Sequence, residues 1–282
     1  MRLTLPSPTS LFSRLVALMS TPTGPPIQYL WTPRHLVVVP AKDWAVHVQS
    51  DGNGPVAECF VTRIEHLKCE NGKEHEFLLI TVQHRTGNNR PTTQLVTDRC
   101  VRNGCSNWLG DFKRSSQILS NGSSASTSSP RINSASPSPS LPEADADDRV
   151  HCGKIERPLE DLAPYKPLRT LEFHGATFPV TSLAILLTIV SLERPEYRAD
   201  EAQCYWYANT IYMAAFSLFH GAEKVDAVHG ESRGKYLHVP IRQSDSVSTV
   251  TEKYDQALKD YKEQTETAKN TVSSSAMLFF FT

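Results

Sequence analysis

The sequence contains few cysteines that could form disulfides, and its positive and negative charges nearly cancel. Six cysteines among 282 residues are too sparse for a disulfide scaffold, so we expect no disulfides and a reducing, cytoplasmic compartment. The formal net charge is −1, which gives no field that would attract nucleic acid. The longest apolar run, 180–192, is shorter than the roughly 20 residues that cross a bilayer, so we expect no transmembrane anchor.

Several familiar site motifs are also missing. The sequence has no glycine-rich phosphate loop, no Gly-x-Ser-x-Gly elbow and no His-Glu-x-x-His motif. Cys100 and Cys105 could be combined with His151 and Cys152 as a zinc site, but the second pair is adjacent, which is awkward for two ligands of one ion. We therefore expect neither a metal nor a cofactor.

The first region with a clear pattern is 29–112, the β half of the expected domain. Its short runs rich in β-branched and aromatic residues are separated by turn residues, and several alternate in polarity, which predicts an antiparallel meander of about five strands. Asn71-Gly72 is a strong hairpin signal between two of these runs. The expected strands are 35–39, 44–49, 57–67, 75–84 and 92–101.

Residues 113–150 are interpreted as a disordered Ser/Pro/acidic insert. Twelve of the 26 residues at 115–140 are serine, and such a segment cannot bury enough apolar surface to offset an ordering entropy of roughly 1–2 kcal/mol per residue. A long insert adds little loop-closure entropy, so the β half and a helical half at 151–269 are expected to share one domain. The ends are interpreted as a disordered, targeting or mis-annotated extension at 1–28, with mitochondrial targeting by 1–18 left open, and a tail at 270–282.

The helical half contains two apolar segments. Val180–Glu193 is expected to be a buried helix ended by Pro195. A second helix is expected between Asp200, a candidate N-cap with Gln203 as its capping-box partner, and Gly221 as the stop. Because this second helix is apolar nearly all round, we expect it to be central.

The end of the chain adds two more elements. A last strand is expected at 235–241. A surface helix follows, one face of which is marked by Val247, Val250, Tyr254, Leu258 and Tyr261. The fold class that follows from all these elements is α+β, with an antiparallel meander sheet packed against a central buried helix.

The one arrangement that points to chemistry starts with Cys204, which opens the central helix. A thiol is a weak nucleophile until it is ionised. A helix N-terminus favours the thiolate by only about 0.3–1 kcal/mol, less than the roughly 1.36 kcal/mol that corresponds to one pKa unit. A cationic neighbour must supply the rest, and a histidine oriented by a second polar group is the usual solution.

His35 and His47 are the candidate histidines, twelve residues apart on two expected neighbouring strands. A three-residue loop at 40–42 would place them opposite each other on one face of a hairpin, whereas a two-residue loop at 41–42 would place them on opposite faces. The sequence leaves this register open. The other polar runs of the β half are interpreted as a solvated face: Glu65-His66, Glu74-His75-Glu76 and Gln83-His84.

This strand pair, with His35, Trp44 and His47, resembles the His-strand-turn-strand-His pattern of lecithin–retinol acyltransferase-like proteins, which are circularly permuted papain-like folds related to NlpC-type cysteine peptidases. The resemblance implies that Cys204 is the nucleophile that forms a thioester with an acyl group, that His35 is the base and that His47 orients it. The sequence QCYW around Cys204 stands where that family has Asn-Cys-Glu-His. The WAVHV and CYWY segments also resemble those of uncharacterised basidiomycete proteins.

Two classes of function follow. The first is a cysteine-dependent acyltransferase or ester/amide hydrolase that uses Cys204, His35 and His47 on a small ester or amide. The second is a non-enzymatic interaction module with a protein partner on the same fold. In that alternative Cys204 is a small core residue, and the two histidines are surface or hydrogen-bonded groups.

Overall fold

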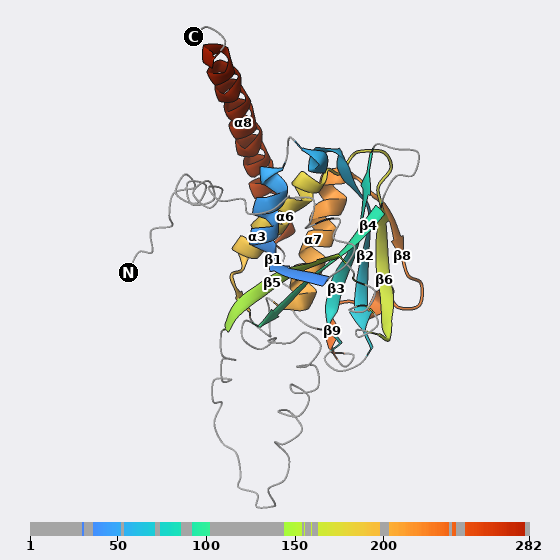
Figure 1. The fold of residues 1–282 in the computed structure, drawn as a ribbon. Helices are drawn as coiled ribbons and strands as arrows, with labels where there is room; N and C mark the ends of the chain where they lie inside the picture. The colour runs from blue at the N-terminus through green and yellow to red at the C-terminus, as the bar shows by residue number, and fades with distance from the viewer. Residues whose placement is uncertain are drawn as a thin grey trace, which may run out of the picture.

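The computed structural model is an α+β fold whose antiparallel sheet packs against a buried central helix, as the sequence predicts (Figure 1). The residues that the structure describes are 30, 36–51, 54–70, 74–85, 92–101, 144–153, 155, 159, 163–197, 203–236, 239–240 and 246–279. The predicted extension at 1–28, His35 and most of the predicted insert lie outside them.

One eight-stranded sheet organises the described residues, and all its strand pairs are antiparallel. The strands are β1 (Leu36–Pro40), β2 (Cys59–Cys69), β3 (Glu76–His84), β4 (Thr92–Val101), β5 (Ala144–Gly153), β6 (Tyr165–Glu172), β7 (Glu196–Tyr197) and β8 (Ala222–Val225). Their order is β1-β5-β4-β3-β2-β6-β8, with β7 paired to β5. The run from β2 to β5 is therefore a meander, and the β2–β3 pairing confirms the hairpin predicted at Asn71-Gly72, although those two residues lie outside the described ranges.

Helices cover one face of this sheet (Figure 1). They are α3 (Ala41–Ser50), α6 (Val180–Glu193) and α7 (Cys204–Phe219), and they share one apolar cluster with the sheet. The predicted bounds of α6 are confirmed, and both α6 and α7 are largely buried. The last helix, α8 (Val247–Phe279), starts against α6 and α7 and then projects beyond the body of the protein (Figure 1).

The strand expected at 44–49 is wrong, because these residues belong to α3. Buried Ala41, Trp44, Ala45 and Val48 recur at the i, i+3, i+4, i+7 spacing of one helix face. That face packs chiefly against α6. β1 consequently pairs with β5 and not with a strand formed by the residues that follow it.

Three further boundaries differ from the sequence expectation. Residues 144–150, assigned to the insert, form most of β5, which lies inside the sheet between β1 and β4. The strand expected at 235–241 is instead two short strands, β9 (Lys235–Tyr236) and β10 (Val239–Pro240), which among the described strands pair only with each other. The helix α8 continues into the segment expected to be a tail.

Side chains of the central strands point alternately to the two faces of the sheet, and an apolar cluster lies on each face. On β3, Leu78 and Ile80 join the larger cluster under the helices, whereas Phe77 and Leu79 join a smaller cluster on the opposite face. The smaller cluster consists of Leu67, Cys69, Phe77, Leu79, Val96 and Ile155. The central strands are therefore buried on both sides.

A buried ion pair joins β4 to β5 beneath the first turn of α7. Arg99 Nε and Nη2 donate to the two carboxylate oxygens of Asp148 at 2.6 and 2.8 Å, and Nη2 also donates to the Arg194 carbonyl at 2.8 Å. The guanidinium lies 4.7 and 5.3 Å from the ring centres of Trp206 and Tyr207. These contacts fix the start of α7 above β4.

We expect Asp148→Ala to lower the free energy of unfolding by about 3–5 kcal/mol, because it leaves the Arg99 charge buried without its counter-ion. Urea denaturation followed by circular dichroism measures this loss. The matched control is Glu65→Ala, which removes an ion pair with the exposed Arg63 and should cost at most about 1 kcal/mol. Equal losses in the two variants would contradict the expectation.

Candidate active site

Cys204 is the first residue of α7, as the sequence predicts. The N-cap predicted at Asp200 is wrong, because Gln203 occupies that position. Cys204 is 6 % exposed, and neither apolar cluster of the described residues contains it. Absence from the clusters does not set Cys204 apart by itself, because the fully buried side chain of Leu168 also lies outside both of them.

The side chain that binds Cys204 is His75. This residue directly precedes β3 and pairs across the hairpin with Cys69, whose amide donates to the His75 carbonyl at 2.9 Å. The His75 ring stacks on Phe77, with 6.4 Å between ring centres. Cys204 raises the pKa of His75 through its charge and a side-chain hydrogen bond, so the two side chains lie next to each other and the imidazole connects the start of α7 to the start of β3.

Asp98 on β4 binds the same imidazole. Its Oδ2 accepts hydrogen bonds from His75 Nε2 at 3.2 Å and from Arg149 Nη2 at 2.9 Å, and its Oδ1 accepts one from His151 Nε2 at 2.9 Å. The Asp98 side chain is 1 % exposed and the His75 side chain 13 %. Thiol, imidazole and carboxylate thus form a continuous chain from α7 to β4, and two residues of β5 support its far end.

The charges of these groups reinforce one another. Burial by itself would lower the pKa of His75, yet Cys204 and Asp98 raise it well above its ordinary value through their negative charge and hydrogen bonds. Burial by itself would raise the pKa of Asp98, yet Arg149, His151 and the hydrogen bonds from both histidines hold it well below its ordinary value. The carboxylate therefore stays ionised, and the His75 imidazole holds a proton more readily than an ordinary histidine does.

Other thiols lie in settings that keep them protonated. Burial raises the pKa of Cys69 to about 11, even though nearby His75 acts to lower it, and burial raises the pKa of Cys152 to about 12. None of the five described cysteines forms a disulfide: Cys59, Cys69, Cys100, Cys152 and Cys204. Cys204 differs from Cys69 and Cys152 in that it interacts with an imidazole of raised pKa through both charge and a side-chain hydrogen bond.

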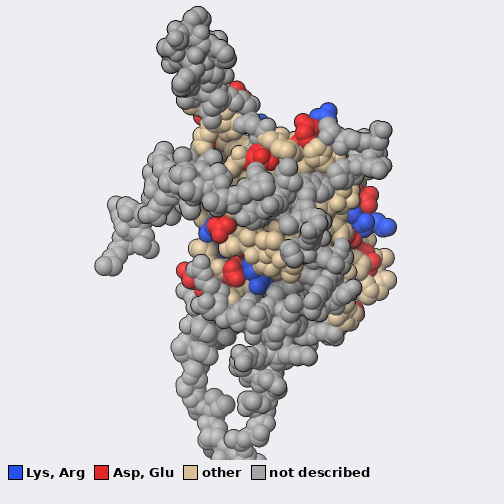
Figure 2. All heavy atoms as spheres, viewed as in Figure 1, with Lys and Arg blue, Asp and Glu red and all other residues tan. Residues whose placement is uncertain are grey.

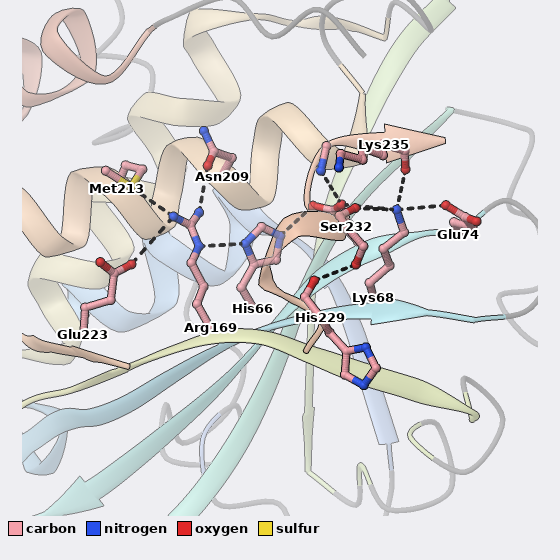
Figure 3. Close-up of polar contacts among 12 residues, drawn as sticks. His66, Lys68, Glu74, Arg169, Asn209, Met213, Glu223, His229, Ser232 and Lys235 are labelled. Carbon is pink, nitrogen blue, oxygen red and sulfur yellow. Dashed lines mark hydrogen bonds and ion pairs between the residues drawn. The ribbon is translucent and has the colours of Figure 1, made fainter. Parts of the chain in front are cut away.

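A second buried polar network lies between the sheet and the middle of α7 (Figure 3). His66 Nε2 bonds Glu76 Oε2 at 2.8 Å, and Arg169 Nε donates to His66 Nδ1 at 3.2 Å. Arg169 reaches α7 through Asn209 Oδ1 at 2.7 Å and the Met213 sulfur at 3.0 Å. Because these groups tie α7 to β2, β3 and β6, they help to fix where the helix begins.

Lys68 extends this network to a loop at the same end of the sheet (Figure 3). Its ammonium donates to the carbonyls of Ser232 and Lys235 and forms an ion pair with Glu74 Oε2 at 2.9 Å. It also lies 5.2 Å from the ring centre of Tyr205, the neighbour of Cys204. The loop around the short helix η2 (Gly230–Ser232) is thereby held close to the first turn of α7.

The structure does not assemble the predicted set of Cys204, His35 and His47 in the predicted way. Cys204 is placed at the helix start, but His47 lies on α3, whose main neighbour is α6. His35 lies outside the described residues. The hairpin that was to bring the two histidines together is absent from the described fold, because 44–49 is helical and β1 pairs with β5.

Sequence reasoning missed His75 and Asp98. The solvated face predicted for Glu65-His66 and Glu74-His75-Glu76 is wrong, because His66 and Glu76 have no exposed surface and His75 is largely buried. A signal was present in β3. The four residues that follow Glu76, from Phe77 to Ile80, are all apolar, so both faces of the strand carry apolar side chains, which indicates a strand covered on both faces. Polar groups at the end of such a strand need buried partners.

No family model, curated protein or solved structure matches this chain. The site is therefore interpreted from its own geometry. No described helix is long and apolar enough to cross a membrane, and within the described ranges no group of three or more His, Cys, Asp or Glu residues could hold a metal ion. Lys and Arg lie interspersed with Asp and Glu on the face shown in Figure 2, which therefore displays no basic patch among its described residues.

We expect Asp98→Asn to reduce the loss in free energy of unfolding that occurs as the pH falls into the acid range. The Asp98 pKa is lowered in the folded protein, so its stabilising contribution is complete above the unfolded pKa of about 3.9 and is lost as the pH falls through the folded value. Urea denaturation at a series of pH values measures this: the parent should lose more stability on acidification than the variant. Asp255→Asn on the exposed face of α8 is the control and should keep the parental slope. Parallel curves for parent and Asp98→Asn would refute this assignment.

Proposed function

We propose that the protein is a cysteine-dependent acyl-transfer enzyme, either an ester or amide hydrolase or an acyltransferase. Cys204 is the nucleophile, His75 the base and Asp98 the carboxylate that orients the base. The observation that carries the proposal is the continuous Cys204–His75–Asp98 contact at the start of a buried helix. His75 and Asp98 take the roles that the sequence had suggested for His35 and His47.

The first half of the reaction forms a thioester. The Cys204 sulfur, its proton held by His75, bonds to the acyl carbon, and the carbonyl electron pair moves onto oxygen. When the carbonyl re-forms, the bond to the leaving alcohol or amine breaks, and the leaving group departs with the proton from His75. Asp98 stabilises the imidazolium during this step and fixes the orientation of the ring.

The second half regenerates the thiol. A water molecule, or an acceptor alcohol or amine, gives a proton to His75 as its oxygen or nitrogen bonds to the thioester carbon. The carbon–sulfur bond then breaks, and the sulfur recovers the proton from His75. The products are a free acid with water, or a new ester or amide with an acceptor. Both outcomes use the same residues of the protein.

The order of these residues along the chain supports a permuted papain-like arrangement. His75 directly precedes β3 and Asp98 lies on β4, both in the first half of the chain, and Cys204 opens the central helix in the second half. A base before the nucleophile in the chain is the order that the resemblance to lecithin–retinol acyltransferase-like proteins implies. The antiparallel sheet behind α7 is consistent with this assignment. The family therefore stays part of the proposal on residue order and layer order alone, because the His35–His47 hairpin that first suggested it is absent from the described fold.

The surroundings of His75 indicate the kind of acyl group that fits. His75 stacks on Phe77, and Phe77 in turn packs edge-on against Tyr165 with 5.9 Å between ring centres. Tyr165 is 36 % exposed, so this aromatic pair extends from the site to the surface. An apolar or aromatic acyl group suits such a wall better than a charged one.

We expect Cys204→Ala to abolish the turnover of p-nitrophenyl acetate, and His75→Gln to lower kcat/KM by about 10²–10⁴-fold, the usual contribution of a positioned base. Release of nitrophenolate measures both. Labelling with iodoacetamide, mapped by mass spectrometry, should mark Cys204 in the parent and slow in His75→Gln.

The matched control for this experiment is Cys152→Ala, which removes a buried thiol whose pKa is about 12. It should keep the parental rate and the parental label. The opposing function is the non-enzymatic interaction module, favoured by the 6 % exposure of Cys204. Equal turnover by the parent and by Cys204→Ala, or no turnover by either, would reject the enzyme and leave the interaction module.

A further inference from the structure

A cavity of about 90 Å³ lies between the start of α3, the end of α6 and β5. Its walls are 40–42 at the start of α3, 146–148 on β5, and Ser191 and Pro195 around the end of α6. At roughly 30 Å³ for each molecule of liquid water, this volume corresponds to about three waters. Lys42 and Pro195 are exposed, so the cavity opens to solvent and can admit a small molecule.

Ser191 brings an unused hydroxyl to this cavity. The residue is 3 % exposed, and its Oγ atom has no hydrogen-bond partner among the residues that the structure describes. Thr188 on the same helix shows the ordinary arrangement, because its Oγ1 donates to the Ala184 carbonyl at 2.9 Å. A buried hydroxyl without a partner loses its water without replacement. Since Ser191 lines the cavity, a molecule bound there would supply the partner that its hydroxyl lacks.

The start of α3 gives one wall of the cavity a positive charge. The first amides of a helix have no partner within the helix, and the N-cap here is Pro40, whose side chain has no hydrogen-bonding group. These amides carry the positive end of the helix dipole, and the Lys42 ammonium adds a full charge beside them. Asp43, the acid of this turn, is exposed and does not belong to the cavity wall. This wall therefore favours a carboxylate.

The opposite wall, on β5, is negative. Side chains alternate along a strand, and Val150 and Cys152 belong to the apolar cluster under the helices, so Asp148 points to that same face, towards α3 and α6. The Asp148 side chain is 7 % exposed and accepts two hydrogen bonds from Arg99. An ionised carboxylate has about four acceptor positions. Asp148 can therefore accept a further hydrogen bond from an ammonium in the cavity.

We propose that this cavity binds a small α-amino acid, with its carboxylate at the start of α3 and its ammonium at Asp148. The Ser191 hydroxyl can donate or accept, so it can bond to either end. A simple carboxylic acid would meet the Asp148 charge without compensation, and a simple amine would meet Lys42 and the positive end of α3. A zwitterion matches both walls, and the volume restricts it to molecules such as glycine and alanine. The walls contain none of the three residues proposed for acyl transfer, so this inference goes beyond the proposed function.

The test is a calorimetric titration of the full chain with glycine, and with acetate and methylammonium as its two halves. We expect one glycine to bind per chain. Each half molecule should bind at least about tenfold more weakly, the usual effect of losing a hydrogen bond to a charged group. Comparing ligands in this way tests the acidic wall without a variant of Asp148, which also holds Arg99.

Two variants test the other groups. Ser191→Ala should weaken glycine binding by about tenfold, yet should not lower the free energy of unfolding measured without glycine, because the hydroxyl has no partner to lose. Lys42→Met removes an exposed charge and should weaken the binding of glycine and of acetate by a similar factor. Ser248→Ala and Lys259→Met on the exposed face of α8 are the matched controls and should bind glycine as the parent does.

Four results would overturn the inference. Absence of saturable glycine binding by the parent removes the site. Equal affinity for glycine and for either half molecule shows that only one charge is recognised. Parental glycine affinity in both Ser191→Ala and Lys42→Met places the ligand elsewhere. Cys204→Ala separates this inference from the proposed function, because it should lose ester turnover and keep glycine binding; loss of glycine binding in that variant would locate the ligand at the thiol.

Discussion

The buried Asp98 carboxylate is the group on which the rest of the site depends. It receives hydrogen bonds from His75 on one side of β4 and from Arg149 and His151 on the other. A buried carboxylate is stable only with such partners. A one-residue slip of β4 would turn Asp98 to the opposite face of the sheet and separate it from all three. The pairing of β3, β4 and β5 and the geometry of the site are therefore one constraint.

The helix that carries the thiol is held by cations on the sheet. Arg99 lies under its first turn against Trp206, and Arg169 lies under its middle against Asn209. Each guanidinium is itself anchored by neighbours on the strands, so neither can move without disrupting the sheet. A central helix made mainly of apolar residues would otherwise be free to slide or rotate along its axis. The two buried arginines fix its register, and with it the position of the sulfur at its end.

Features of the fold that depend on residues close together in the sequence could be predicted, whereas features that depend on distant segments could not. The start of a helix at Cys204, the bounds of α6 and the hairpin after β2 follow from short-range patterns and are confirmed. The segment 41–50 fits both a helix face and an alternating strand, and tertiary packing on α6 decides in favour of the helix. His75 and Asp98 could not be recognised locally, because their burial depends on chain segments remote in sequence.

The site combines residues that precede the long segment between β4 and β5 in the sequence with residues that follow it. His75 and Asp98 precede residue 102, whereas Arg149, His151 and Cys204 follow residue 143. A growing polypeptide therefore makes the base and its carboxylate first and the sulfur last. Until β5 docks on β4, the Asp98 carboxylate lacks its donors Arg149 and His151, and until α7 forms, His75 lacks its contact with Cys204. If Cys204 is the nucleophile, as proposed, it therefore meets its base only after the chain has been made beyond residue 204 and has folded, so shorter chains do not react through this cysteine.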